Sequence, residues 1–231
     1  MKNIDVVVLC GGKGERLQAV VKDRPKVMAE IHGRVFLDIL IEHALSFGLR
    51  RFILCSGYRS EYIETYYQNR KKTFELVFSR ESSPLGTGGA VKNAQKLIEN
   101  DTFMVMNGDS FCRVNLNHFY DFHMARHSLL SIVAARIDNS EDFGSLSIDD
   151  SGKITAFQEK AGETKEFVNA GVYLFKKEIL SLIPKGQKNS LEYDFFPRLI
   201  GKGIYGFVTE DHLIDIGTPQ RYERAKVFFA E

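Results

Sequence analysis

The run Val6-Val7-Val8-Leu9-Cys10-Gly11-Gly12-Lys13-Gly14-Glu15-Arg16-Leu17 decides how this chain folds. Its apolar half is typical of a buried β-strand, and the clustered glycines predict a tight loop at the carboxyl end of that strand. Glycines leave backbone N–H groups free to point at a ligand, which is a common way to hold phosphate. Arg16, and Lys26 in the following Pro25-Lys26 pair, add cations at the same end. The stretch therefore predicts a site for a nucleoside triphosphate.

Two common phosphate-binding motifs do not fit this spacing. A Walker A loop requires Gly-x4-Gly-Lys-Ser/Thr, which occurs nowhere in the chain. The dinucleotide fingerprint requires a third glycine where Leu17 stands, which disfavours a dehydrogenase. What remains is Leu-x-Gly-Gly-x-Gly-x-Arg-Leu followed by Pro-Lys. Taken alone, a partial glycine pattern is weak, and a plain strand-to-helix turn would also explain it.

The composition fits one globular domain. The 231 residues are 44% hydrophobic, enough for one sizeable core. Lysine and arginine total 31 against 30 aspartate and glutamate, and this balance disfavours a nucleic-acid partner. Cys10, Cys55 and Cys112 lie beside apolar runs and are expected to be buried thiols in a reducing cytosol. The apolar N-terminal run is too short for a signal peptide or membrane span, so we expect a cytoplasmic protein without a membrane partner.

Strand and helix patterns alternate along the chain. Helical patterns are expected at 35–47, 60–67 and 88–98, and each is followed by a strand-like run, at 51–55, 74–78 and 102–106. Ser60 is expected to cap the second of these helices. This order predicts an α/β fold: a three-layer Rossmann-like sandwich with a mostly parallel mixed sheet and ligands at the carboxyl ends of its strands. After Leu116 the segments shorten, and Asp149-Asp150-Ser151-Gly152 predicts a hairpin turn.

Two carboxylates stand at positions suited to a metal ion. Asp109 ends Asn107-Gly108-Asp109 directly after an apolar strand, and Mg²⁺ prefers carboxylate and phosphate oxygens. Asp215 alternates with apolar residues shortly before Thr218-Pro219, which opens the last predicted helix. The structural alternatives are an ordinary Asn-Gly-Asp turn and a charge that offsets a helix dipole. The six histidines show no pairing and are expected to be ordinary polar positions.

Together these motifs resemble those of the sugar-1-phosphate nucleotidylyltransferases, whose signature is Gly-Gly-x-Gly-(Ser/Thr)-Arg-Leu with a downstream Pro-Lys. Such enzymes join a nucleoside triphosphate to a sugar 1-phosphate and release pyrophosphate. The resemblance implies Mg²⁺ held by Asp109 and Asp215, with Arg16 and Lys26 as the other catalytic residues. The nucleotide contacts that it implies come from Leu9, Gly11, Gly12, Gly14, Glu15, Arg16, Gly86, Thr87, Asn107 and Gly108. Those to the sugar phosphate come from Gly144, Glu159, Lys160 and Asn169.

The resemblance spans the whole chain, and we expect a single domain, 1–231. Residues 1–115 would mainly bind the nucleotide and residues 116–231 mainly the sugar phosphate. Glu15 departs from the signature, because it stands where the family has serine or threonine, so only its backbone N–H is expected to serve.

The choice of substrates rests on the resemblance alone. Residues 20–23 with Pro25-Lys26-Val27-Met28-Ala29 look most like the D-glycero-D-manno-heptose 1-phosphate guanylyltransferase branch, which implies GTP. Uridylyl or thymidylyl transfer to a hexose 1-phosphate stays open. A regulator that binds nucleotide sugars without turnover is a weaker alternative, since all four catalytic residues are present. Assembly into a homo-oligomer is also left open.

Overall fold

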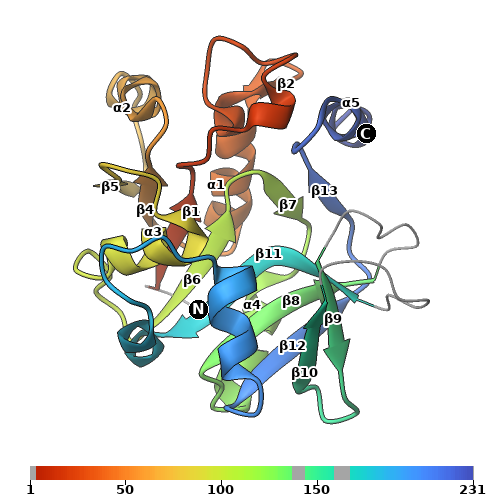
Figure 1. The fold of residues 1–231 in the computed structure, drawn as a ribbon. Helices are drawn as coiled ribbons and strands as arrows, with labels where there is room; N and C mark the ends of the chain where they lie inside the picture. The colour runs from red at the N-terminus through yellow and green to blue at the C-terminus, as the bar shows by residue number, and fades with distance from the viewer. Residues whose placement is uncertain (1–3, 137–143, 159–166, 231) are drawn as a thin grey trace.

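The computed structural model describes residues 4–136, 144–158 and 167–230 (Figure 1). The strands are β1 (Asp5–Leu9), β2 (Glu30–Ile31), β3 (Arg34–Val35), β4 (Arg51–Ser56), β5 (Glu75–Arg80), β6 (Thr102–Asn107), β7 (Ser110–Cys112), β8 (Leu130–Ala135), β9 (Ser145–Ile148), β10 (Ile154–Gln158), β11 (Phe167–Lys176), β12 (Ile204–Thr209) and β13 (Leu213–Asp215). The α-helices are α1 (Phe36–Ser46), α2 (Ser60–Gln68), α3 (Gly86–Ala94), α4 (Leu116–Ala125) and α5 (Pro219–Phe228). Shorter helical turns are η1 (Glu15–Leu17), η2 (Lys26–Met28), η3 (Lys177–Leu182), η4 (Leu191–Phe195) and η5 (Phe196–Leu199).

Nine strands form one mixed sheet in the order β10-β9-β11-β6-β1-β4-β5, with β8 paired to β11 and β12 to β8 (Figure 1). The strands β6, β1, β4 and β5 run parallel, whereas β11 runs antiparallel to β6 and β8 antiparallel to β11. The predicted mostly parallel mixed sheet is thus confirmed. Its parallel half comes from the first 107 residues, and the antiparallel strands come from the second half of the chain.

The sheet is covered on both faces, which explains the uninterrupted apolar run of β1. Val6 and Val8 belong to one apolar cluster and Val7 to another, and all three side chains are at most 1% exposed. Successive side chains on a strand point to opposite faces, so two clusters mean two covered faces. The predicted three-layer arrangement is confirmed on this ground.

A separate two-stranded ladder connects the end of the chain to the middle. The strand β13 pairs antiparallel with β7, and Asp215 lies opposite Ser110. The backbone N–H of Ile216 also donates to the carbonyl oxygen of Asp109 at 3.0 Å. The ladder therefore holds the C-terminal segment against the carboxyl end of β6.

Some local details differ from the sequence-based expectations. Ser60 is the first residue of α2 rather than its cap; Arg59 precedes it with φ 52°, and no described side chain caps that end. The helix α3 begins two residues earlier than expected, at Gly86, although glycine is a poor helix former. The carbonyl oxygen of Asn189 accepts the N–H groups of Gly88 and Gly89 at 2.9 and 3.1 Å, so a distant segment stabilises this helix start.

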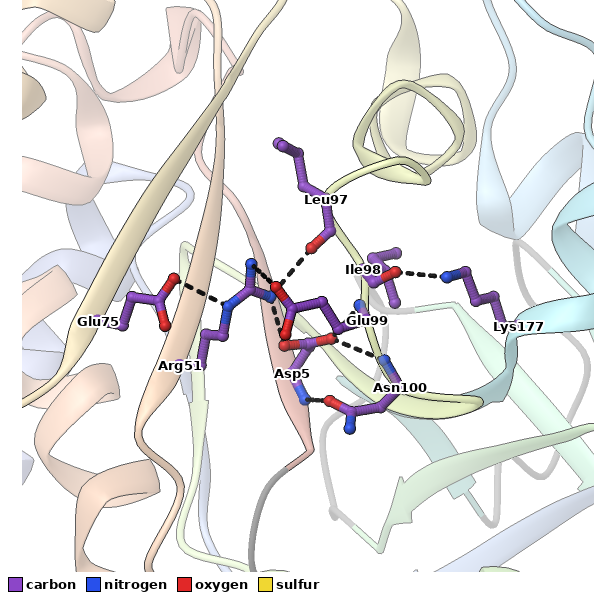
Figure 2. Close-up of polar contacts among 8 residues, drawn as sticks. All are labelled: Asp5, Arg51, Glu75, Leu97, Ile98, Glu99, Asn100 and Lys177. Carbon is purple, nitrogen blue, oxygen red and sulfur yellow. Dashed lines mark hydrogen bonds and ion pairs between the residues drawn. The ribbon is translucent and has the colours of Figure 1, made fainter.

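Arg51 clamps the amino ends of the strands, as Figure 2 shows. Its guanidinium group donates to Asp5 at 2.6 Å and to Glu75 at 3.0 Å, and it lies 3.0 Å from a Glu99 carboxylate oxygen. The buried Asp5 carboxylate also accepts the backbone N–H groups of Glu99 and Asn100 at 2.6 and 3.1 Å. These contacts lie at the end of β1 opposite the glycine loop, so they support the sheet and do not reach the site.

Candidate active site

A cavity of about 690 Å³ opens at the carboxyl ends of the parallel strands. Its walls are residues 9–15 after β1, Lys26 and Val27, residues 57–58 after β4, parts of 81–90 after β5, and Asn107 and Asp109 after β6. Ligands bind at this edge of open α/β sheets because several loops converge there. The position of the cavity is the one expected from the sequence.

Most of the predicted nucleotide residues line this cavity: Leu9, Gly11, Gly12, Gly14, Glu15, Gly86, Thr87 and Asn107. Gly108 is not among the lining residues. Its N–H donates to the carbonyl oxygen of Leu9 at 3.0 Å, and a Cβ there would lie 2.5 Å from that oxygen. Glycine at this position therefore lets the ends of β1 and β6 approach closely. The Glu15 side chain is 75% exposed and lies 4.0 Å from the Lys13 ammonium group.

The glycine loop packs directly on Lys26. Gly14 has φ +63°, and a Cβ on it would lie 2.8 Å from Cβ of Lys26. The Lys26 ammonium group in turn donates a hydrogen bond to the Asp109 carboxylate. Burial raises the pKa of Asp109, but the charge and hydrogen bond of Lys26 outweigh it and hold this pKa below its ordinary value. Asp109 is therefore an ionised carboxylate at neutral pH.

Asp215 reaches the same edge through β13. Its carboxylate accepts hydrogen bonds from Arg221 and from the backbone N–H of Gly217, both at 2.7 Å. A Cβ added to Gly217 would lie 3.6 Å from Nη2 of Arg16, so the Arg16 guanidinium group is close to this motif. Neither Asp215 nor Arg16 is among the residues lining this cavity. They stand beside it, on the side where β7 and β13 meet.

Asp109 and Asp215 are the two carboxylates that could share a metal ion. No group of three or more His, Cys, Asp or Glu side chains suited to a metal occurs in the described part of the chain. A cation nevertheless faces each carboxylate, Lys26 at Asp109 and Arg221 at Asp215. A hard oxygen donor set that attracts positive charge fits Mg²⁺, which usually takes only one or two carboxylates and fills its other positions with phosphate and water oxygens.

The residues expected on the sugar-phosphate side are partly described. Asn169 lies near the amino end of β11, and its backbone N–H donates to the carbonyl oxygen of Gly144 at 3.0 Å. Gly144 is exposed, and a Cβ there would meet no atom of the described residues within 4 Å. The two residues are therefore neighbours at the amino end of β11. Glu159 and Lys160 lie outside the described residues.

Several residues of the cavity were not predicted from the sequence, among them Glu81 and Lys188. Glu81 follows β5 as Asp109 follows β6, and that shared position is the signal that could have revealed it. Its carboxylate accepts the backbone N–H of Leu85 at 2.9 Å, and burial raises its pKa. Lys188 comes from the second half of the chain and reaches the cavity because its neighbour Asn189 packs on the glycines of α3. No sequence pattern indicates that contact.

The sheet, the glycine loop and the cations beside Asp109 and Asp215 define the protein as a nucleotide-binding α/β enzyme. The chain belongs to the nucleotidyl transferase family, whose model matches residues 5–231. Over 224 residues it is 34% identical to D-glycero-alpha-D-manno-heptose 1-phosphate guanylyltransferase from Aneurinibacillus thermoaerophilus, covering 96% of this chain and 97% of that protein. It is 32% identical to mannose-1-phosphate guanylyltransferase from Mycobacterium tuberculosis, covering 96% of this chain and 63% of that protein.

A solved structure agrees with these relatives. HddC from Yersinia pseudotuberculosis, complexed with GMP-PN, is similar with a TM-score of 0.86 and 36% identity, covering 98% of this chain and 100% of that one. None of the helices in the described ranges combines the length and the apolar character needed to cross a bilayer. All three cysteines are buried free thiols, as expected from the sequence.

Proposed function

We propose that this protein transfers a guanylyl group from GTP to D-glycero-α-D-manno-heptose 1-phosphate, giving a GDP-heptose and pyrophosphate. The heptose is supported by the Aneurinibacillus relative, which matches the chain over nearly its whole length. The guanine nucleotide is supported by the two guanylyltransferase relatives and by the GMP-PN in the Yersinia structure. Within the chain, the observation that supports guanine is the position of the Glu81 carboxylate at the border of the cavity.

Glu81 fits guanine better than uracil or thymine. Its carboxylate borders the nucleotide cavity, receives one backbone hydrogen bond, and has no ion-pair partner in the ranges that the structure covers. The Watson–Crick edge of guanine offers two neighbouring donors, N1–H and N2–H, which a carboxylate accepts. Uracil and thymine offer one donor between two carbonyl acceptors, and a carboxylate would repel those. This site therefore favours guanine.

The transfer step needs charge neutralisation and alignment. An oxygen of the sugar phosphate attacks the α-phosphorus of GTP, a new P–O bond forms, and the bond to the pyrophosphate oxygen breaks. We assign Lys26 to the α-phosphate region, Arg16 to the departing pyrophosphate, and the backbone N–H groups of Gly11, Gly12 and Gly14 to phosphate oxygens. Aligning two anions in one site supplies most of the rate, because little covalent help is needed.

Asp109 and Asp215 would hold Mg²⁺ at the meeting point of β6, β7 and β13. When bound, the ion neutralises phosphate charge and draws the phosphates together. The chain's own part is to supply these two carboxylates and to keep Asp109 ionised. Lys26 serves that purpose at Asp109, where it lowers the carboxyl pKa against the effect of burial.

The sugar 1-phosphate would lie along the amino end of β11. Asn169 and Gly144 form one edge of this site, and Glu159 and Lys160 directly follow β10 in the sequence. We assign Lys160 to the attacking phosphate and Glu159 to sugar hydroxyls. A cytoplasmic location is also proposed, because buried free thiols suit a reducing compartment.

The test is pyrophosphate release by the purified chain with Mg²⁺. Heptose 1-phosphate is paired with GTP, ATP, UTP, CTP and dTTP in turn, and GTP is then paired with mannose and glucose 1-phosphates. We expect GTP with the heptose to give the highest kcat/KM. A preference for UTP or dTTP would overturn the guanylyl assignment, and a preference for mannose 1-phosphate would overturn the heptose assignment alone. Tight nucleotide-sugar binding without turnover would instead identify a regulator.

A further inference from the structure

Glu192, in η4, lies between the two halves of the site without lining the cavity. Its carboxylate accepts hydrogen bonds from the hydroxyl groups of Thr87 at 2.8 Å, Ser190 at 2.9 Å and Tyr173 at 3.3 Å. Thr87 and Ser190 share one carboxylate oxygen, and Tyr173 binds the other. Among the described residues no cation pairs with Glu192. Its charge is thus balanced by hydroxyl donors, and such charge-assisted bonds are stronger than neutral ones.

On one side, Glu192 fixes the nucleotide loop, here the residues that lead into α3 together with its first residues, Gly86 and Thr87, which line the cavity. The Thr87 hydroxyl donates to Glu192 and accepts the backbone N–H of Leu191 at 2.8 Å, so both roles of that hydroxyl are assigned. The neighbouring Gly86 has φ +71°, and a Cβ there would lie 2.6 Å from the carbonyl oxygen of Asn189. Loop and η4 segment therefore interlock, and a shift of one moves the other.

On the other side, Glu192 reaches Asn169 through Tyr173. The side-chain amide of Asn169 donates to the Tyr173 hydroxyl at 3.0 Å, and that hydroxyl donates to Glu192. Tyr173 is fully buried, and burial first of all, followed by the Glu192 charge, raises its pKa well above the ordinary value. The phenol therefore keeps its proton, so it remains a donor to the carboxylate.

A bulge in β11 makes this link possible. The register of β11 against β8 shifts between Asn169 and Tyr173, and Gly171 has φ +72° inside the bulge. Gly171 also lies against Asn107, because a Cβ there would be 2.9 Å from the Asn107 amide nitrogen. The buried Oδ1 of Asn107, which borders the nucleotide cavity, has no partner among the described residues. The bulged strand thus joins both substrate sides.

We infer that Glu192 is a positioning residue that holds the nucleotide loop through Thr87 and the sugar-phosphate residue Asn169 through Tyr173. The inference rests on the proposed function for the identity of the two substrates and for the assignment of Asn169 to the sugar phosphate. A single carboxylate sets both sides in register, which the in-line attack requires. A misplacement of about 1 Å can lower a rate about 100-fold, so this register matters.

The test compares three variants with the wild type. Glu192→Gln keeps the shape but replaces one acceptor oxygen by a donor. Tyr173→Phe removes the hydroxyl that connects Glu192 to Asn169, and it leaves the hydrogen bond between Thr87 and Glu192 in place. Asp194→Asn is the matched control, because Asp194 lies in the same turn and accepts the backbone N–H of Ser190 at 2.8 Å without contacting Thr87 or Tyr173. For each protein we would measure kcat, KM for both substrates, the affinity for a non-reactive GTP analogue, and the melting temperature.

For Glu192→Gln we expect kcat to fall and both KM values to rise, with kcat/KM lowered about tenfold or more, as for loss of a charge-assisted hydrogen bond. Tyr173→Phe should raise KM for the sugar 1-phosphate and leave binding of the GTP analogue unchanged. Asp194→Asn should stay within about twofold of the wild type. Equal behaviour of Glu192→Gln and Asp194→Asn, or a loss in Glu192→Gln that is confined to one substrate, would overturn the inference.

Failure of the proposed function can be distinguished from failure of the inference about Glu192. It appears in the wild type, as turnover of another nucleotide or sugar phosphate, and the three variants are then compared on that pair. If the wild type turns nothing over, binding of the two ligands to Glu192→Gln still decides, since the inference requires both affinities to fall.

Discussion

Asp215 lies directly opposite Ser110 in the antiparallel pair of β13 and β7, one residue along from Asp109. The bond from the N–H of Ile216 to the carbonyl oxygen of Asp109, at 3.0 Å, fixes the same contact. Two acids from opposite halves of the chain are thereby neighbours across one ladder. The candidate metal site therefore depends on correct docking of the C-terminal segment, and not on either motif alone.

Replacing Asp109 by asparagine should lower kcat at least about 100-fold at saturating Mg²⁺, since a charged ligand is lost while the shape is kept. Pyrophosphate release measures the rate, and binding of Mn²⁺ followed by its electron paramagnetic resonance signal measures metal affinity directly. Asp121→Asn, at an exposed position in α4, is the control. Normal rates and normal Mn²⁺ affinity in Asp109→Asn would remove this residue from the metal site.

Exchanging Glu81 for glutamine should reduce the preference for GTP. An amide can present only one acceptor to the two donors of guanine, and an unmatched donor in such a site costs about 1–3 kcal/mol, or roughly five- to 150-fold in kcat/KM. Turnover of UTP should change much less, so the ratio of kcat/KM for GTP to kcat/KM for UTP should fall. Glu61→Gln, on the exposed side of α2, controls for the loss of charge. An unaltered GTP to UTP ratio would mean that Glu81 does not read the base.

His123 should make stability depend on pH. It is fully buried with a 2.9 Å hydrogen bond to the Ser131 hydroxyl, and burial, followed by the charge of Lys176, lowers its pKa from 6.5 to about 4. Between these values the unfolded chain binds a proton that the native imidazole does not. The contribution of His123 to the free energy of unfolding should therefore be fully present above pH 6.5. As the pH decreases to 4, the free energy of unfolding should fall by up to about 3 kcal/mol.

Urea unfolding at several pH values tests this expectation. In His123→Gln the free energy of unfolding should decrease much less between pH 6.5 and 4. His118→Gln changes an exposed residue of the same helix and should show the same decrease as the wild type. Parallel curves for all three proteins would contradict the assignment.

The Arg51 clamp should affect stability without affecting catalysis. Asp5→Asn leaves a largely buried guanidinium group short of its main counter-charge, which typically costs about 3–5 kcal/mol of unfolding free energy. Glu75→Gln removes a partner of the same arginine, but this partner is 58% exposed, so the loss should be at most about 1 kcal/mol. KM values should stay unchanged in both, because the clamp lies at the opposite end of the strands. Equal losses in the two variants would show that burial of Asp5 does not matter.

Local sequence patterns were sufficient for the parallel half of the sheet. A continuous apolar run such as Val6-Val7-Val8 can be stable only where both faces are covered, so the run already predicts a central strand. Glycines after such a strand mark the ligand loop, and the acid of Asn107-Gly108-Asp109 marks the next strand end. Each of these signals lies within a few residues of its own strand, which is why it is readable without a structure.

Long-range contacts were beyond the sequence. Gly88 and Gly89 look like ligand-binding glycines, yet their N–H groups bind the carbonyl oxygen of Asn189. His123 looks like an ordinary polar position, yet it is fully buried. In each case the partner lies on a different element, and spacing along the chain contains no information about it.

The sequence by itself determined the fold class, and it singled out the glycine loop and Arg16, Lys26, Asp109 and Asp215 as site candidates, because each of these follows from a local pattern or a short motif. Only the tertiary structure decided that Asp215 stands beside Asp109, that Glu81 borders the nucleotide cavity, and that Glu192 joins Thr87 to Tyr173. The physical reason is that packing of β13 on β7, and of residues 187–189 on α3, brings these groups together. Such contacts form only when the whole chain is folded.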